Sequence, residues 1–248
     1  MAEPKISYQL FPLGDSAITI DLGNCIDEQL NRRVLSLSDW LEAHRFHGVL
    51  DIIVAYSSVS VFVDPLVVRA SGIAGSEAVL KWVGDWLERA WRESAAGWSG
   101  DEAGRQGSGG EEAILPIPVC YEGEYAPDLD WAARQTGLSA EEVVSIHSNG
   151  VYRVYMVGFL PGFSYMGVLD ERIQLPRKLE PVPVVAGGVG IAGMQTGIYP
   201  LNSPGGWQII GRTPLTLFRP DRTPAALLHP GNRLRFKVIT AEEFESWT

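Results

Sequence analysis

The chain has 248 residues, of which 46% are hydrophobic and 20% are charged, a composition typical of a folded globular protein with one large or two ordinary domains. Its 20 basic and 30 acidic residues give a formal net charge of -10, which argues against nucleic-acid binding because that function needs positive charge. The sequence shows no signal-peptide pattern and no apolar run of about 18 residues that could span a membrane. We therefore expect a cytoplasmic protein.

The first expected domain covers residues 1–95. Short β-branched segments predict two strands between residues 6 and 23, and two more on either side of Tyr56. Asp27 is expected to start a helix, because apolar residues recur after it at helical spacing. A second helix is expected from Ser76, with several Val, Leu and Trp side chains on one face. This order predicts an α+β domain with two helices on a small antiparallel sheet.

Residues 96–111 are rich in Gly, Ser and charge, which predicts a flexible linker. A second domain is expected at 112–248. Its first strand, AILPIPVCY, contains two prolines and is expected at an edge or a barrel rim. Asp128 and a capping box at Ser139–Glu142 predict two helices. From Val151 onward, only short strands separated by Pro and Gly are predicted, including the segment LTLF, which favours a mainly β, closed or strongly curled barrel.

The segment GVGIAG contains Gly188, Gly190 and Gly193 in the G-x-G-x-x-G spacing of dinucleotide-binding turns. That function also needs a helix after the glycines and an acidic residue further on. Here the residues that follow, MQTGIYP, are β-like and end in a proline. The glycines are better explained by a strand that passes close to other backbone.

Aromatic and polar side chains concentrate in the expected barrel, and they suit a small polar ligand that carries a carboxylate or an amide. The alternative is that the aromatic rings fill the barrel and the arginines pair with surface acids. The chain contains no phosphate-binding Gly-Lys loop, and its four His residues form no zinc motif. The candidate substrate-binding residues are Phe159, Phe163, Tyr165, Arg177, Gln195, Thr196, Tyr199, Trp207 and Arg212.

Three long segments, GFLPGFSYMG, QTGIYPLNSPGGWQIIGRTPLTLF and LLHPGNRLRF, closely resemble the allophanate hydrolase subunit 1 family. That family includes the kinase inhibitor KipI and the B component of the bacterial ATP-dependent 5-oxoprolinase. The resemblance implies a small α+β domain followed by a cyclophilin-like β-barrel. It also implies two partners, a homologous C component of the allophanate hydrolase subunit 2 type and an A component. Such complexes convert 5-oxo-L-proline to L-glutamate with ATP as co-substrate.

On this reading the chain alone is not expected to bind ATP, and no metal is expected in it. Arg177 and Arg212 would hold a carboxylate or phosphate, Gln195 and Tyr199 would orient the amide, and the candidate catalytic proton carriers are His147 and His229. One segment departs from the family pattern. Residues 178–188 carry Val, Pro and Gly where the family usually has Arg and Ser, so the ligand differs or the partner supplies the missing groups.

Two other functions stay open at this point. A KipI-like protein would bind a sensor histidine kinase and inhibit its autophosphorylation. Prolyl isomerase activity is suggested only by the expected fold, and a shared fold does not imply a shared function.

Overall fold

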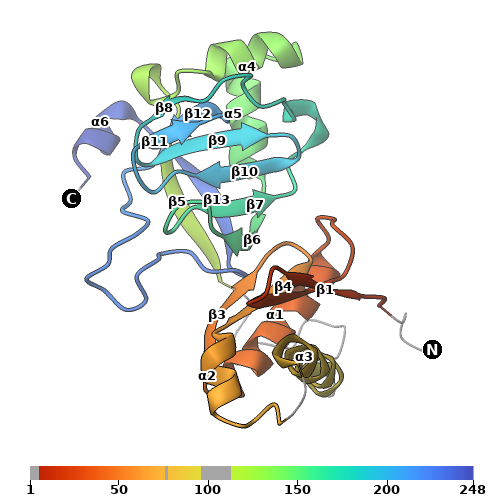
Figure 1. Ribbon diagram of the computed structural model, residues 1–248. Coiled ribbons are helices and arrows are strands. Elements are labelled where there is room, and N and C mark those ends of the chain that lie inside the picture. The colour runs from red at the N-terminus through yellow and green to blue at the C-terminus, as the bar shows by residue number, and fades with distance from the viewer. Residues whose placement is uncertain (1–5, 76–77, 96–112, 248) are drawn as a thin grey trace. The chain divides into compact units, whose positions relative to one another are not determined.

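The computed structural model describes residues 6–75, 78–95 and 113–247. The chain divides into two compact units, residues 1–109 and 110–248, which are described separately (Figure 1). The expected linker at 96–111 lies outside the described residues. Among the described residues, the helices are all too short or too polar to cross a membrane.

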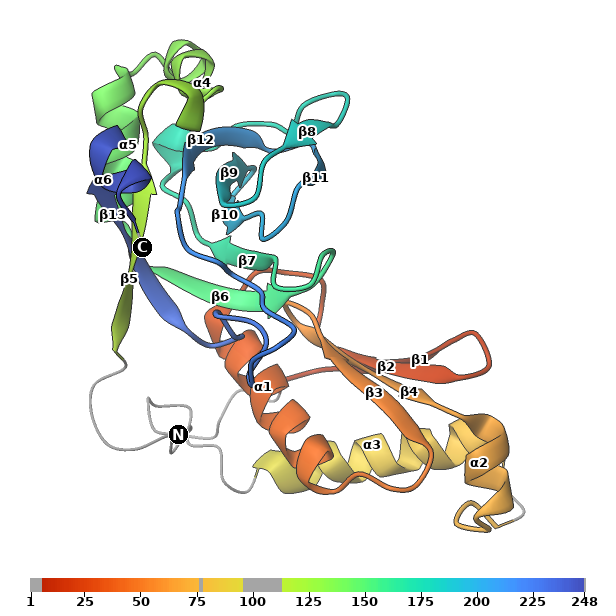
Figure 2. The same cartoon turned by 90° about the vertical axis from the view of Figure 1, so that its left-hand side faces the viewer.

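The N-terminal unit contains a four-stranded antiparallel sheet with the strand order β1-β2-β4-β3. Helices α1 and α3 contact each other and pack on the sheet (Figures 1 and 2). Its elements are β1 (Gln9–Leu13), β2 (Ala17–Asp21), α1 (Glu28–Ala43), β3 (Val49–Val54), β4 (Ser58–Val63), α2 (Pro65–Ala70) and α3 (Val79–Ala95).

Local sequence signals explain where these helices begin. Asp27 starts α1 as expected, because its carboxylate accepts a hydrogen bond from the backbone N–H of Leu30 at 2.8 Å. The structure contains a third helix, α2, that the sequence analysis missed. Asp64 caps it and Pro65 occupies its first turn, where the missing N–H of proline costs nothing. The expected helix start at Ser76 lies outside the described residues.

Arg33 joins α1 to the end of α3 inside this unit. Its guanidinium donates hydrogen bonds to the Ser94 hydroxyl at 2.8 Å and to the Trp91 carbonyl, and it lies 3.9 Å from the centre of the Trp91 ring. The side chain is almost fully buried, and burial lowers the pKa of Arg33 to about 10. A cation at the carbonyl end of a helix is favoured by the helix dipole, so this contact fixes how the two helices pack.

The C-terminal unit is built around a closed seven-stranded barrel with the order β10-β7-β6-β13-β5-β12-β9. A two-stranded sheet of β8 and β11 lies outside the barrel beside β9 and β10 (Figures 1 and 2). Its elements are β5 (Ile114–Cys120), η1 (Gly123–Tyr125), α4 (Leu129–Thr136), α5 (Ala140–Asn149), β6 (Tyr152–Val157), β7 (Ser164–Gly167), η2 (Glu171–Ile173), β8 (Val182–Val184), β9 (Gly188–Ala192), β10 (Gln195–Ile198), β11 (Ser203–Gly205), β12 (Gln208–Arg212), β13 (Arg233–Ile239) and α6 (Ala241–Glu245).

The barrel agrees with the mainly β prediction, but some details differ. Strand β5 is parallel to β13 over its whole length and pairs with β12 only at Cys120. Within the described residues, no strand pairs with the remainder of the β5 edge that faces β12. Pro116 and Pro118 have no backbone N–H, and at this edge none is needed for strand pairing. The predicted strand LTLF is wrong: this segment makes one isolated bridge, at Phe218. The short helix α6 was also missed, although Thr240 and Glu243 form a capping box.

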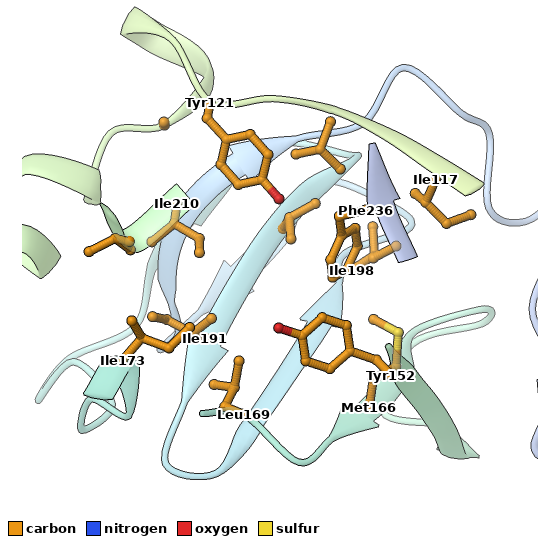
Figure 3. Packing of buried hydrophobic residues seen from close by; sticks show 14 of the residues in the cluster. Ile117, Tyr121, Tyr152, Met166, Leu169, Ile173, Ile191, Ile198, Ile210 and Phe236 are labelled. Carbon is orange, nitrogen blue, oxygen red and sulfur yellow. The ribbon is translucent and has the colours of Figure 1, made fainter. Parts of the chain in front are cut away.

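Alternate residues of the barrel strands face inward and form the main core. Figure 3 shows Met166, Ile191, Ile198, Ile210 and Phe236 converging on this core, and all five are buried. The intervening residues of the same strands face outward, since side chains alternate along a strand. The barrel therefore has an apolar interior and a separate outer surface.

We predict that Arg33→Met lowers the free energy of unfolding by about 2 kcal/mol, because it removes the buried guanidinium that donates to the Trp91 carbonyl and the Ser94 hydroxyl and leaves these two groups only their long 3.4 Å contact with each other. Urea unfolding followed by tryptophan fluorescence measures the effect. Arg32→Met is the matched control. Arg32 makes a partly exposed pair with Glu28 on the same helix, so its loss should cost less than about 0.5 kcal/mol. Equal effects of the two substitutions would contradict the role of Arg33.

Candidate functional site

The glycines of GVGIAG and of the following strand form a flat patch on the outer surface of the barrel. A Cβ atom on Gly190 would lie 3.0 Å from Cβ of Trp207, and one on Gly197 would lie 2.9 Å from the Trp207 indole and 3.0 Å from the Phe163 ring. Such distances are shorter than side chains tolerate. Gly190 and Gly197 are therefore present because aromatic side chains lie directly on their strands, where the sequence predicted a close approach of other backbone, whereas a Cβ at Gly193 would meet no atom within 4 Å.

The rings on this patch are Phe163, Tyr165, Tyr199 and Trp207, called here the aromatic cluster. Phe163 makes edge contacts with the other three rings at centroid distances of 4.6 to 5.5 Å. Tyr165 and Trp207 also meet edge to face, at 5.8 Å. Edge-to-face contacts are a favoured geometry for aromatic pairs. Four of the nine predicted substrate-binding residues therefore come together in one packed group.

Arg177 supplies the positive charge next to this cluster. Its guanidinium lies 6.0 Å from the centre of the Trp207 ring. The side chain is exposed, and among the described residues it makes no hydrogen bond or ion pair. Burial raises the pKa of Tyr165, and the charge of Arg177 acts in the opposite direction. An unpaired guanidinium beside aromatic rings can bind a carboxylate on a flat ligand.

Other predicted residues occupy different positions. Gln195 lies on β10 two residues before Gly197, so it shares the outward face of that strand. Phe159 is 66% exposed and touches Phe163 edge to face at 5.8 Å. Thr196 faces the interior, and Arg212 contacts Phe244 rather than the aromatic cluster.

His147 belongs to a buried hydrogen-bond chain inside the barrel. The Thr196 hydroxyl donates to the Gly190 carbonyl at 3.1 Å, so it must accept the hydrogen bond from Nε2 of His147 at 2.9 Å. Nδ1 of His147 is then the acceptor for the Tyr121 hydroxyl, at 2.8 Å. Figure 3 shows the Tyr121 hydroxyl directed into the core. This network assigns the proton of the neutral imidazole to Nε2.

The surroundings of His147 favour a structural role. The imidazole has no exposed surface and stacks on Phe236 at 4.5 Å. Burial lowers the pKa of His147 to about 3, so the ring is neutral near pH 7. Proton transfer by His147 stays a prediction that this geometry does not favour. His229 is half-buried, and its described hydrogen bonds are made by its backbone, in a turn with Asn232.

Asp128 has a different role from the one predicted for it. Its side chain does not cap α4. Instead, Oδ2 accepts hydrogen bonds from the backbone N–H of Ile209 and from Nζ of Lys178, both at 2.6 Å. Sequence spacing could not reveal this contact, because the three residues are distant in the chain. No group of three or more His, Cys, Asp or Glu within the described ranges is arranged to bind a metal ion.

We predict that Gly197→Ala destabilises the C-terminal unit by about 1 to 3 kcal/mol, because the new methyl group would overlap the Ser164 carbonyl and the Trp207 indole. Thermal unfolding of the full chain measures this loss. Gly206→Ala is the control, since its nearest contact would be an ordinary 3.8 Å and we expect a change within about 0.5 kcal/mol. A stable Gly197→Ala variant with unchanged tryptophan fluorescence would show that the rings do not need this space.

We also predict a pH-dependent contribution from His147. Its pKa is about 3 when folded and about 6.5 when unfolded, so below pH 6.5 the unfolded chain binds more protons and stability falls as the pH falls. Between pH 7 and pH 5, the unmodified chain should lose about 2 kcal/mol relative to His147→Gln. Urea unfolding at both pH values provides the test. His47→Gln, at an exposed position, should keep the slope of the unmodified chain, and an identical slope for His147→Gln would contradict the assignment.

Comparison with known proteins identifies related chains. Residues 8–228 match the family described as carboxyltransferase domain, subdomain C and D. The chain is 42% identical to the B component of 5-oxoprolinase from Bacillus subtilis over 243 residues, which cover 98% of this chain and 97% of that protein.

Solved structures show the same fold. The crystal structure of TTHA0988 matches 91% of this chain with a TM-score of 0.71 and 33% identity, and the chain spans 40% of that longer protein. A conserved uncharacterized protein from Pyrococcus horikoshii matches 95% of this chain over its own full length, with 39% identity and a TM-score of 0.51. The chain therefore belongs to the carboxyltransferase subdomain C and D family, together with the bacterial proteins named as the B component of 5-oxoprolinase.

Proposed function

We propose that this chain is the B component of an ATP-dependent 5-oxoprolinase, which converts 5-oxo-L-proline to L-glutamate together with a homologous C component and an A component. The observation that carries this proposal is the nearly full-length match to a protein of that name. A cytoplasmic hetero-oligomer is the form that we expect to be active.

The proposed substrate suits the aromatic cluster and Arg177. 5-Oxo-L-proline has a small, nearly flat lactam ring and one carboxylate. The ring would pack against Tyr165, the half-buried member of the aromatic cluster, which lies within reach of the Arg177 charge, and the carboxylate would receive charge-assisted hydrogen bonds from Arg177. Arg177 is suited to this role because no described residue already neutralises its charge. Phe159, which contacts Phe163, would border such a ligand.

The chemistry explains why several proteins would be needed. An unactivated lactam hydrolyses slowly, so the γ-phosphoryl group of ATP would be transferred to the amide oxygen and water would then attack the ring carbon. Collapse of that adduct breaks the ring carbon–nitrogen bond, with a proton going to the nitrogen, and leaves an acyl phosphate that a second water hydrolyses to L-glutamate and inorganic phosphate. The present chain would bind and orient the ring and exclude water from it. Phosphate binding and activation would come from the partners.

The segment 178–188 supports a contribution from the partners. Lys178 already pairs with Asp128 at 2.6 Å, and the following strand β8 places Val184 against the aromatic cluster. The chain therefore has Arg177 as the cation next to the Trp207 ring, without the further Arg of the family pattern. A dianionic phosphorylated intermediate would need additional positive charge, which we assign to a partner protein.

Activity in the assembled complex tests this proposal. With the A and C components, the unmodified chain should support ATP-dependent release of L-glutamate from 5-oxo-L-proline. Arg177→Met should lower kcat/KM by about 10- to 100-fold, mainly through KM, because it removes a charge-assisted contact with the ground state. Arg219→Met, which removes an exposed pair with Asp221, is the control and should leave the kinetics unchanged.

The absence of glutamate release from the complete complex would contradict the proposed reaction. Normal kinetics for Arg177→Met in an active complex would contradict only the assignment of the substrate site. The hypothesis of kinase inhibition remains separate, and it predicts that the purified chain slows the autophosphorylation of a sensor histidine kinase.

A further inference from the structure

A second pocket lies on the same unit, with a volume of about 470 Å³. It is formed by η1, the start of α4, β8 and β12. We call it the Arg212 pocket. Its lining includes Glu124, Tyr125, Lys178, Val184, Ile209 and Arg212. Its volume is within the range of small-molecule sites.

The side chain of Arg212 is held in this pocket, and the terminal nitrogens of its guanidinium can bind a ligand. Its Nε donates a hydrogen bond to the Ala186 carbonyl at 2.9 Å, and its guanidinium lies 5.5 Å from the centre of the Phe244 ring. In the part of the chain that the structure describes, the two terminal nitrogens of Arg212 make no hydrogen bond or ion pair. The arginine is therefore oriented by one backbone contact and retains four N–H donors.

Tyr125 provides a further donor beside Arg212. Its ring packs against Phe244 at 4.3 Å, so one aromatic side chain from α6 supports both groups. The Tyr125 hydroxyl has no hydrogen-bond partner among the described residues. Burial and the nearby charges of Glu245 and Glu124 raise the pKa of Tyr125, while Arg212 opposes this effect. The phenol is therefore protonated near pH 7 and can donate.

The charged side chains that line the pocket balance overall, so the pocket can accept at most a single negative charge, placed at Arg212. Lys178 is neutralised by its 2.6 Å ion pair with Asp128, which leaves Arg212 as the cation without a counter-ion among the described lining residues. The exposed carboxylate of Glu124 also borders the pocket and would repel a second negative charge. A carboxylate fits this balance better than a phosphate dianion.

Part of the pocket lining is apolar. Val182, Val184 and Val185 follow one another along β8 and beyond its end, and Ile209 faces the pocket from β12. This surface can pack against an aliphatic or cyclic hydrocarbon group of a ligand. A bound molecule would therefore have its charge at Arg212 and its apolar part on β8.

We propose that the Arg212 pocket is a binding site for a small monocarboxylate with a compact apolar body, held by the Arg212 guanidinium and the Tyr125 hydroxyl. The site differs from the proposed substrate site, because Arg177 lies beside Trp207 whereas Arg212 lies beside Phe244. The sequence analysis assigned both arginines to one ligand, and the structure associates them with different aromatic side chains.

Methyl NMR of the full chain with labelled valines tests the proposal, with cyclopentanecarboxylate as the probe. Val182 and Val185 report on the Arg212 pocket, since they line it and are not part of the aromatic cluster. We expect their signals to shift during titration. Arg212→Met should weaken this binding about tenfold or more, and Tyr125→Phe about two- to tenfold. Arg177→Met is the matched control and should leave the shifts at Val182 and Val185 unchanged.

Two further ligands test the charge argument on the unmodified chain, so the result does not depend on the folding of a variant. Neutral cyclopentanecarboxamide and inorganic phosphate should each bind about tenfold more weakly than the carboxylate, or not at all. Unshifted Val182 and Val185 signals, equal affinity of the amide, tighter binding of phosphate, or equal affinity of Arg212→Met would each overturn the proposal. None of these results depends on 5-oxoprolinase activity, so the proposed function is tested independently.

Discussion

The absence of side chains at Gly190 and Gly197 is the constraint on which the outer half of the barrel unit depends. With no Cβ at these positions, the Trp207 indole and the Phe163 ring lie directly on the strands. Tyr165 and Tyr199 complete the group through edge contacts with Phe163, and Val184 of β8 packs on it. Arg177 then lies beside a rigid aromatic surface. Of the aromatic cluster and Arg177, Tyr165 alone lies on a strand, so packing among the rings holds the other rings in place.

The barrel wall separates two kinds of polar group. Thr196 and His147 face inward and are satisfied by a hydrogen-bond chain that runs from Tyr121 to the Gly190 carbonyl. Arg177, beside the outer face, keeps its charged group available for a ligand. Strand β9 takes part in both arrangements. The carbonyl oxygen of Gly190 accepts the hydrogen bond from Thr196, and the Trp207 side chain lies next to the Cα of the same residue.

The sequence predicted the mainly β barrel and the capping box at Ser139, because these depend on local patterns. It also identified the residues of the aromatic cluster, through their spacing among Pro and Gly. It could not predict that Asp128 pairs with Lys178, or that Phe244 from α6 contacts both Tyr125 and Arg212. Those contacts join distant segments, and they depend on the closure of the barrel. The inward position of His147 was missed because a lone histidine at a helix end carries no signal of burial.

The central claim is that the aromatic cluster and Arg177 form the site for the substrate. A crystal structure of the assembled complex with bound 5-oxo-L-proline tests this most directly. The account predicts the substrate carboxylate within hydrogen-bond distance of the Arg177 guanidinium and the lactam ring against Tyr165. Substrate bound elsewhere, with Arg177 directed to solvent or to a partner protein, would contradict it.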